Sequence, residues 1–267
     1  MWLTGPPNSK GRDFDEYLHH RPRPRERAAA RAQPVRPGRR VKRNERLGEA
    51  VAPDGTVLVL CRHDRDYVIR AGNEELMSTR RHHSEDVLAE QVCVPLRETP
   101  DARVLIGGLG LGFTLRAALR SLASDARVVV AEIMPEVIRW NQDRSYALAA
   151  DALLDPRVDL RCDDVANVLV ASAGAFDAIM LDVDNGAAAL TTGGNAALYR
   201  AQGIRRAAAA LRPGGRLAYW SADDDPAFER ALRREGLSVE VVRAQAHPGL
   251  RLWHTIFVAR RPAGRGS

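Results

Sequence analysis

One stretch decides the fold of this chain: Val104-Leu105-Ile106-Gly107-Gly108-Leu109-Gly110-Leu111-Gly112, followed by a helical pattern over 114–122. The three apolar residues predict a buried strand, and the glycines predict a tight turn in which the backbone can approach a ligand. The helix that follows offers unpaired N–H groups at its N-terminus. We therefore expect a nucleotide-type cofactor at the carboxyl end of this strand, held by Gly107, Gly108, Gly110 and Gly112.

Further apolar segments alternate with helical patterns along the rest of the chain. Short strands are expected over 128–131, 158–161, 178–181 and 216–220. Helices are expected over 165–171, from Asn195 to the Arg212-Pro213-Gly214-Gly215 stop signal, and over 226–235. Strands separated by helices pair in parallel through right-handed crossovers, which predicts a Rossmann-like α/β fold with a mostly parallel sheet. The last two strands, over 237–242 and 252–258, have a short connection and predict an antiparallel edge.

Residues 99–262 are thus expected to form the Rossmann-like domain that carries the site. Residues 51–98 are expected to form a small β-rich entry module, with short strands over 56–60 and 67–70. Ser84 is expected to cap a helix that runs to about Val92.

The first 50 residues differ in composition from the rest. They hold 13 Lys and Arg against six Asp and Glu, whereas the other 217 residues hold 27 against 28. Such a basic, Pro-rich segment with few apolar residues is expected to be a disordered leader. The alternative is an arm that binds nucleic acid through its positive charge. No aromatic residue lies among residues 21–46 to stack on bases, so a solvated tail is the favoured interpretation.

Composition excludes several other classes of protein. Hydrophobic residues make up 45% of the chain, which is enough for a sizeable core. The cysteines, Cys61, Cys93 and Cys162, lie too far apart for a disulfide scaffold or a zinc site, so no metal is expected. No apolar run approaches the roughly 18 residues of a membrane span. We expect a cytoplasmic protein without a membrane partner, and a homodimer paired through the entry module is left open.

Glu132 follows the glycine loop at the end of the second strand. A carboxylate about 20 residues after such a loop can accept both hydroxyl groups of a ribose. The dinucleotide pattern G-x-G-x-x-G is absent, because its third glycine would fall at Phe113 or Leu115. A nicotinamide or flavin dinucleotide is therefore disfavoured.

Four later segments follow the order of a known family. They are Asp155-Pro156-Arg157-Val158, Cys162-Asp163-Asp164, Phe176-Asp177-Ala178-Ile179-Met180-Leu181-Asp182 and Leu211-Arg212-Pro213-Gly214-Gly215. With the glycine loop, they make the chain resemble the class I S-adenosylmethionine-dependent methyltransferase fold. Within that fold the chain resembles the spermidine synthase family, the polyamine aminopropyltransferases, over roughly residues 56–260.

The resemblance implies roles for particular residues. Glu132 would hold the ribose of the donor, Ile133 would pack on the adenine, and Asp163 or Asp164 would accept a hydrogen bond from the adenine amino group. Asp182 would be the catalytic carboxylate that takes a proton from the acceptor amine. An amine is mostly protonated at neutral pH, and it must lose that proton before it can act as a nucleophile. Two further acids complete the implied site: Asp184 for a second ammonium group and Glu85 for the substrate.

Three departures from the family pattern keep other functions open. The acid within the family's glycine loop is replaced by Gly110, the family's Tyr-His-Glu by His83-Ser84-Glu85, and its Ser-Ser/Thr-Asp-Pro by Val183-Asp184-Asn185-Gly186. The first hypothesis is an aminopropyltransferase that uses decarboxylated S-adenosylmethionine and a polyamine. The second is a methyltransferase that uses S-adenosylmethionine on a small molecule. The third is a non-catalytic binding protein that works through its basic arm.

Overall fold

The computed structural model describes residues 44–183 and 195–263. Most of the expected leader and the candidate catalytic residue Asp184 lie outside these ranges. None of the described helices is long and apolar enough to cross a membrane.

A small antiparallel sheet opens the described part of the chain. It contains β1 (Glu45–Val51), β2 (Val57–His63), β3 (Asp66–Ala71) and β4 (Glu74–Ser78), paired in sequence order. Leu58 and Leu60 alternate with more exposed residues along β2, so one face of this sheet joins the core. β1 begins at Glu45, within the range expected for the leader. This part of the chain packs closely against Trp140: a Cβ at Gly48 would come 2.4 Å from its indole nitrogen.

The second sheet has seven strands. Its order is β10-β11-β9-β8-β5-β6-β7. The strands are β5 (Arg103–Gly107), β6 (Arg127–Glu132), β7 (Val158–Cys162), β8 (Phe176–Leu181), β9 (Leu211–Ser221), β10 (Ser238–Gln245) and β11 (Trp253–Arg260). Neighbours from β7 to β9 pair in parallel, whereas β11 pairs antiparallel with both β9 and β10. The expected mostly parallel α/β sheet is confirmed, with the antiparallel strand one position in from the edge.

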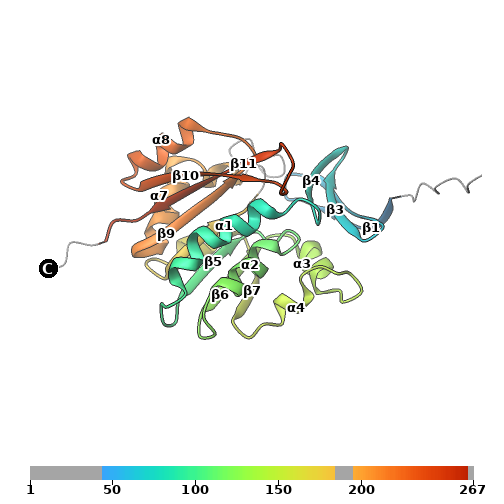
Figure 1. The fold of residues 1–267 in the computed structure, drawn as a ribbon, viewed down its shortest axis with the longest axis horizontal. Coiled ribbons are helices and arrows are strands. Elements are labelled where there is room, and N and C mark those ends of the chain that lie inside the picture. Colours follow the sequence, from blue (N-terminus) through green and yellow to red (C-terminus); the bar gives the residue numbers. More distant parts are fainter. Residues whose placement is uncertain (1–43, 184–194, 264–267) are drawn as a thin grey trace, which may run out of the picture. The chain divides into compact units, whose positions relative to one another are not determined.

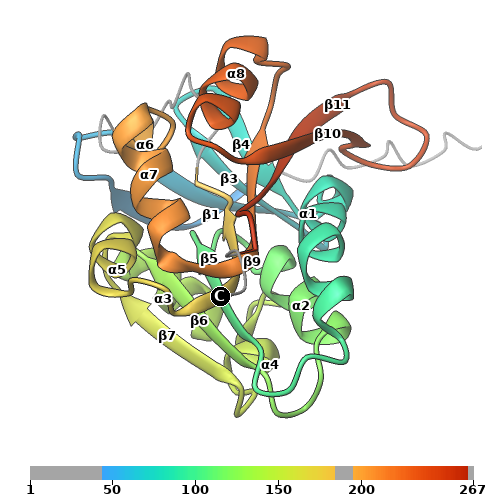
Figure 2. The ribbon, with the colours of Figure 1, turned by 90° about the vertical axis from the view of Figure 1, so that its left-hand side faces the viewer.

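Helices cover both faces of this sheet, as Figures 1 and 2 show. One face carries α1 (His83–Cys93), α2 (Phe113–Ser121), α3 (Pro135–Gln142) and α4 (Ala150–Leu153). The other carries α5 (Val165–Ala171), α6 (Asn195–Leu198), α7 (Ala201–Ala210) and α8 (Pro226–Arg234). A short 3-10 helix, η1 (Val94–Leu96), follows α1. The central strands β5 and β8 are buried on both sides, which is why their apolar runs are continuous.

Two local expectations were wrong. The segment after Asn195 forms two helices, and β9 begins at Leu211, so the glycines expected only to stop a helix lie within the strand. The pairing of β8 with β9 shifts register between Phe176 and Ala178, and this irregularity accommodates the extra residues at the start of β9. Ser84 does not cap α1: His82 occupies the N-cap position without a side-chain bond, and Ser84 is fully buried, where long-range partners take up its hydroxyl group.

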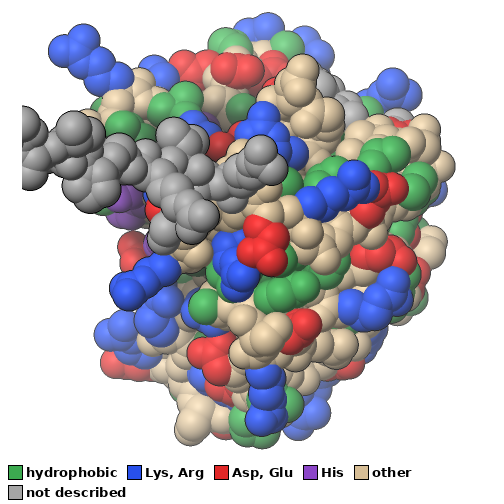
Figure 3. All heavy atoms as spheres, turned by 90° about the vertical axis from the view of Figure 1, so that its right-hand side faces the viewer, with side chains coloured by type: hydrophobic (Ala, Val, Ile, Leu, Met, Phe, Trp, Pro, Cys, Tyr) green, Lys and Arg blue, Asp and Glu red, His purple; other side chains and the backbone are tan. Residues whose placement is uncertain are grey.

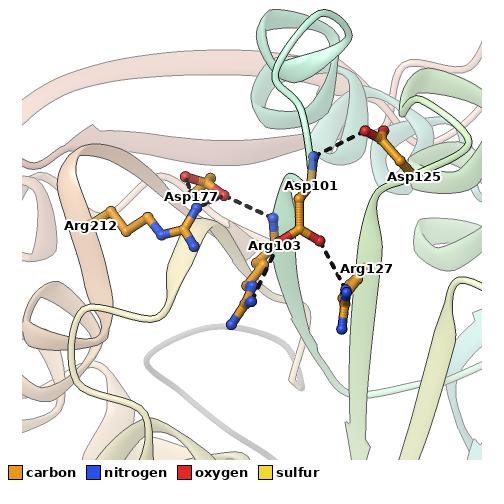
Figure 4. Close-up of polar contacts among 6 residues, drawn as sticks. All are labelled: Asp101, Arg103, Asp125, Arg127, Asp177 and Arg212. Carbon is orange, nitrogen blue, oxygen red and sulfur yellow. Dashed lines mark hydrogen bonds and ion pairs between the residues drawn. The ribbon is translucent and has the colours of Figure 1, made fainter.

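Charged side chains connect the amino ends of the parallel strands (Figure 4). The guanidinium group of Arg212 donates to both oxygens of Asp177, at 2.8 and 2.9 Å. Asp177 also accepts the backbone N–H of Arg103 at 2.8 Å, and Arg127 donates to Asp101 at 2.9 Å. Two residues of the segments that carry the family resemblance, Asp177 and Arg212, thus bind each other at the edge of the sheet away from the glycine loop.

The Asp155-Pro156-Arg157-Val158 segment has a structural role, like the pair of Asp177 and Arg212. Arg157 bonds to Asp155 at 2.8 Å and donates to the carbonyl oxygens of Leu122 and Ala123, at the end of α2. The Asp155 carboxylate correspondingly raises the pKa of the Arg157 guanidinium. This segment therefore anchors the entry to β7.

Candidate active site

A cavity of about 290 Å³ lies at the carboxyl ends of β5, β6 and β8. The glycine loop forms its floor, the small sheet contributes Leu58, Ile69 and Met77, and β11 contributes His254. Ligands of open α/β sheets bind at this edge, so the cavity occupies the place that the sequence predicted for a cofactor.

Close packing requires the glycines of the loop. Gly108 and Gly112 have φ of +85° and +79°, in the left-handed region. A Cβ at Gly108 would lie 2.5 Å from the carbonyl oxygen of Asp182, and one at Gly112 would lie 2.3 Å from the Cβ of Ala149. The loop is therefore held tightly against the end of β8, with its backbone facing the cavity.

Gly110, where the family pattern has an acid, faces the small sheet. Its φ is +53°, and a Cβ there would lie 2.9 Å from the sulfur of Met77 on β4. Met77 lines the cavity beside this glycine. An apolar thioether thus occupies space next to the position at which the family carries a carboxylate.

Glu132 is buried at 7% exposure and ties the loop to the next turn. Its two carboxylate oxygens accept the backbone N–H groups of Leu109 and Met134, both at 2.9 Å. These two bonds orient the Glu132 carboxylate at the wall of the cavity that it lines. This arrangement suits the hydroxyl groups of a ribose.

The predicted adenine-binding residues lie on neighbouring turns. Ile133 is 38% exposed and lines the cavity, as does Asp164. Asp164 caps α5 by accepting the backbone N–H of Ala166 at 2.8 Å. Asp163 is turned towards Asn167, whose side-chain amide donates to it at 2.9 Å. Of the two acids, Asp164 is therefore better placed to meet an adenine amino group.

Asp182 lines the cavity directly after β8. Its backbone N–H donates to the carbonyl oxygen of Gly107 at 2.9 Å, and its carboxylate accepts the hydroxyl of Thr114 at 2.6 Å. Thr114 lies in the first turn of α2 and is buried. The sequence analysis did not identify Thr114, because nothing in its local pattern distinguishes it from any other threonine near a helix start.

Glu85 brings a second carboxyl group to Asp182 from α1. Burial and the negative charge of Asp182 raise the pKa of Glu85 to about 8, so it is mostly protonated at neutral pH. The structure therefore brings together two of the predicted acids, Asp182 and Glu85, in one cavity, and the pKa of Glu85 is raised there. A buried carboxyl group with a raised pKa beside a specific charged partner is typical of functional sites.

A group that the sequence analysis missed lies behind Glu85. The hydroxyl oxygen of Ser84 is 2.5 Å from a carboxyl oxygen of Glu85 and 2.8 Å from Nδ1 of His254. The indole N–H of Trp220 donates to the same hydroxyl oxygen at 3.1 Å. Burial lowers the pKa of His254 to about 4, with the positive charge of Arg81 adding to the effect, so its imidazole is neutral. No local sequence signal links these residues, since Ser84 and His254 are 170 positions apart.

The cavity is strongly acidic. Among the described residues, its carboxyl groups are Glu74, Glu75, Glu85, Glu132, Asp164 and Asp182. Arg81 also lines the cavity and forms an ion pair with Glu75. On the face of the molecule that Figure 3 shows, basic and acidic side chains are interspersed. Acid is therefore concentrated in the cavity, which favours a cationic ligand.

No cluster of three or more metal-ligating side chains occurs within residues 44–183 and 195–263. Three of the cavity acids also have structural roles among the described residues. Glu132 holds the glycine loop, Asp164 caps α5, and Asp182 accepts the hydroxyl of Thr114.

Comparisons with known proteins agree with this geometry. No family model matches the sequence, and no curated protein matches it. Among solved structures, a spermidine synthase in complex with the transition-state analogue AdoDATO is 18% identical, with a TM-score of 0.62 over 81% of this chain and 72% of that one. The spermidine synthase from Thermotoga maritima is 19% identical, with a TM-score of 0.62 over 81% and 73%.

A probable spermidine synthase from Corynebacterium glutamicum is 18% identical, with a TM-score of 0.55 over 80% of this chain and 79% of that one. These likenesses each cover about four fifths of this chain, and they agree with the resemblance found in the sequence. The chain has the spermidine synthase-like fold, with the α/β sheet of the class I methyltransferases.

Proposed function

We propose that this protein is a spermidine synthase-like aminopropyltransferase, which transfers a propylamine group from decarboxylated S-adenosylmethionine to an amine acceptor. The observation that supports this most is the pair of acids Asp182 and Glu85 in an acidic cavity beside the glycine loop. The solved spermidine synthases with the same fold support the same class of reaction.

The residues of the cavity suit an adenosyl donor. Glu132 holds the ribose hydroxyl groups, Ile133 packs on the adenine, and Asp164 accepts from the adenine amino group. Gly108 allows the loop backbone to lie against the end of β8, where a side chain would collide. The donor, when bound, supplies an electrophilic carbon next to a positively charged sulfur.

The acids then prepare the acceptor. Asp182, held by Thr114, orients the acceptor nitrogen and accepts its proton, because only an uncharged amine has the lone pair needed for attack. The nitrogen forms a bond to the donor carbon while the carbon–sulfur bond breaks, with its electron pair going to sulfur. Glu74 and Glu75 give the rest of the acceptor path a negative lining that attracts further ammonium groups.

The direct test supplies the purified protein with decarboxylated S-adenosylmethionine and a panel of diamines and triamines, and measures release of methylthioadenosine. We expect turnover with at least one amine, and a loss of at least about 100-fold in kcat for Asp182→Asn. Asp159→Asn, an exposed acid on β7, is the matched control and should retain full activity. Absence of methylthioadenosine with every amine would overturn the proposal.

Methyl transfer from intact S-adenosylmethionine is the second candidate, and Arg81 is the observation that favours it. Arg81 lines the cavity, where its guanidinium group can pair with the carboxylate of an intact donor, whereas Gly110 replaces the family's loop acid and packs against Met77. Calorimetry with both donors separates the candidates. Methyl transfer predicts at least tenfold tighter binding of the intact donor, about 1.4 kcal/mol, and loss of that preference in Arg81→Gln.

A further inference from the structure

The hydroxyl group of Ser84 has three polar neighbours from three different elements. They are Glu85 on α1, Trp220 on β9 and His254 on β11. Ser84 is fully buried, so no water competes for these bonds at the hydroxyl itself. This group lies next to the cavity but takes no part in the donor contacts described above.

The chemistry of the three neighbours restricts the proton positions. The indole N–H of Trp220 can only donate, so it takes one of the two lone pairs on the Ser84 oxygen. One lone pair and one hydrogen remain for Glu85 and His254. One of these two must therefore donate to Ser84 while the other accepts from it.

Only two arrangements satisfy this restriction. In the first, protonated Glu85 donates to Ser84, and Ser84 donates to an unprotonated Nδ1 of His254, whose hydrogen is on Nε2. In the second, ionised Glu85 accepts from Ser84, and His254 donates through a protonated Nδ1. The protonation state of Glu85 is thereby linked to the tautomer of His254.

We propose that Glu85, Ser84 and His254 form a proton relay between the cavity and the partly exposed imidazole of His254. Glu85 gives its proton to the Ser84 oxygen, Ser84 gives its own hydrogen to Nδ1, and His254 releases the Nε2 proton to solvent. One proton leaves, Glu85 becomes a carboxylate, and the imidazole stays neutral in its other tautomer. The ring returns to the Nε2–H form when Glu85 is protonated again: Nε2 takes up a proton from solvent, Nδ1 returns its hydrogen to the Ser84 oxygen, and Ser84 gives its own hydrogen to Glu85.

The surrounding charges support this direction of transfer. Burial raises the pKa of Glu85 most, the negative charges of Asp182 and Asp86 raise it further, and the hydrogen bond with Ser84 lowers it, so that on balance Glu85 holds a proton at neutral pH. Arg81 and Asp223 face His254 with opposite signs, and burial keeps its imidazole neutral. The relay thus connects a carboxyl group with a pKa of about 8 to a ring that can change tautomer without gaining charge. Its use in removing the acceptor's proton rests on the proposed function, whereas the coupling itself does not.

The coupling is tested in the free protein by nitrogen NMR of the histidine side chains, with the His254 signals assigned by their loss in His254→Gln. We expect His254 to change from the Nε2–H to the Nδ1–H tautomer as the pH rises through about 8. Glu85→Gln and Ser84→Ala should each abolish the change, and His247→Gln, an exposed histidine on the same hairpin, should leave it intact. A tautomer that stays constant across this pH range, or one that changes equally in Ser84→Ala, would overturn the relay.

The use of the relay is tested separately by kinetics. With an accepted amine, His254→Gln and Ser84→Ala should lower kcat by about 10- to 100-fold with little change in KM, and should move the alkaline limb of the pH profile. His247→Gln should match the parent. Equal kcat and pH profiles in all variants would exclude a role in turnover. If no amine is accepted by the parent protein, the proposed function fails, and the NMR result still decides the coupling.

Discussion

Thr114 donates a hydrogen bond of 2.6 Å to the carboxylate of Asp182, across 68 positions of sequence. The bond joins the first turn of α2, which follows the glycine loop, to the end of β8, against which Gly108 of that loop packs. Asp182 is also held through its backbone N–H, which donates to Gly107. The carboxylate that we propose as catalytic therefore has a fixed orientation before any ligand binds.

Removal of the Thr114 hydroxyl should impair catalysis more than folding. Thr114→Val keeps the shape of the side chain, and loss of a hydrogen bond to a charged group, about 1.5–3 kcal/mol, should lower kcat by about 10- to 100-fold. Thr114→Ser keeps the hydroxyl and should stay close to the parent. Steady-state rates with an accepted amine check this, and equal rates for the valine and serine variants would contradict it.

Glu132 should matter for both donor binding and stability. Glu132→Ala leaves the backbone N–H groups of Leu109 and Met134 without their acceptor, which should cost about 1–3 kcal/mol in the free energy of unfolding. Donor affinity should fall by at least about tenfold in calorimetry. Glu136→Gln, an acid on the neighbouring helix whose partner is the exposed Arg139, serves as the control and should alter neither quantity.

The raised pKa of Glu85 predicts a pH dependence of stability. Between pH 4.5 and about 8 the folded chain keeps a proton on Glu85 that the unfolded chain has lost. The free energy of unfolding should therefore fall as the pH rises through this window, by up to about 1.4 kcal/mol per pH unit from this group.

Denaturant unfolding at a series of pH values measures this slope. Glu85→Gln should lack the contribution, so the difference between parent and variant should change across the window and level off above about pH 8. Glu90→Gln, an exposed acid on the same helix, should behave as the parent. A constant difference between parent and Glu85→Gln would show that Glu85 titrates normally.

The contact between Gly110 and Met77 predicts a paired effect. Gly110→Asp places a Cβ against the Met77 sulfur, and should destabilise the fold by about 1–3 kcal/mol. Met77→Ala should recover part of this loss in the double variant, because the two positions are in contact. The double variant should also shift donor preference towards the decarboxylated compound, measured by calorimetry with both donors. Additive effects of the two substitutions on stability would contradict the contact.

Asp177 should affect stability alone. Its carboxylate is 14% exposed and bonds to Arg212 and to the backbone of Arg103, at the edge of the sheet away from the cavity. Asp177→Ala should lower the free energy of unfolding by about 1–3 kcal/mol without changing donor affinity. Asp159→Ala, which breaks the exposed pair with Arg161, should cost less than about 1 kcal/mol. A selective loss of donor binding in Asp177→Ala would contradict this prediction and would show that Asp177 acts in donor binding.

Much of the fold could be predicted because its signals are local. The apolar run 104–106, the glycines after it and Glu132 at the end of the next strand identify the edge of the sheet where a ligand binds. Such signals arise from backbone sterics and from burial of neighbouring residues, which act over a few positions. The expected cap of α1 at Ser84 and the expected start of the strand at residue 216 were wrong: the N-cap is His82, and β9 begins at Leu211. At both places long-range contacts decide where the element begins.

By itself, the sequence determined the parallel α/β architecture, the position of the glycine loop and four of the acids that line the cavity, Glu85, Glu132, Asp164 and Asp182, but not Glu74 and Glu75. Only the tertiary structure decided which of those acids meet. It brought Glu85 to Asp182, turned Asp164 rather than Asp163 to the cavity, and joined Ser84 to His254. Helix and strand periodicity reports which side of one element is buried, but the partner of a buried polar group comes from another element, and only packing of the whole chain selects it.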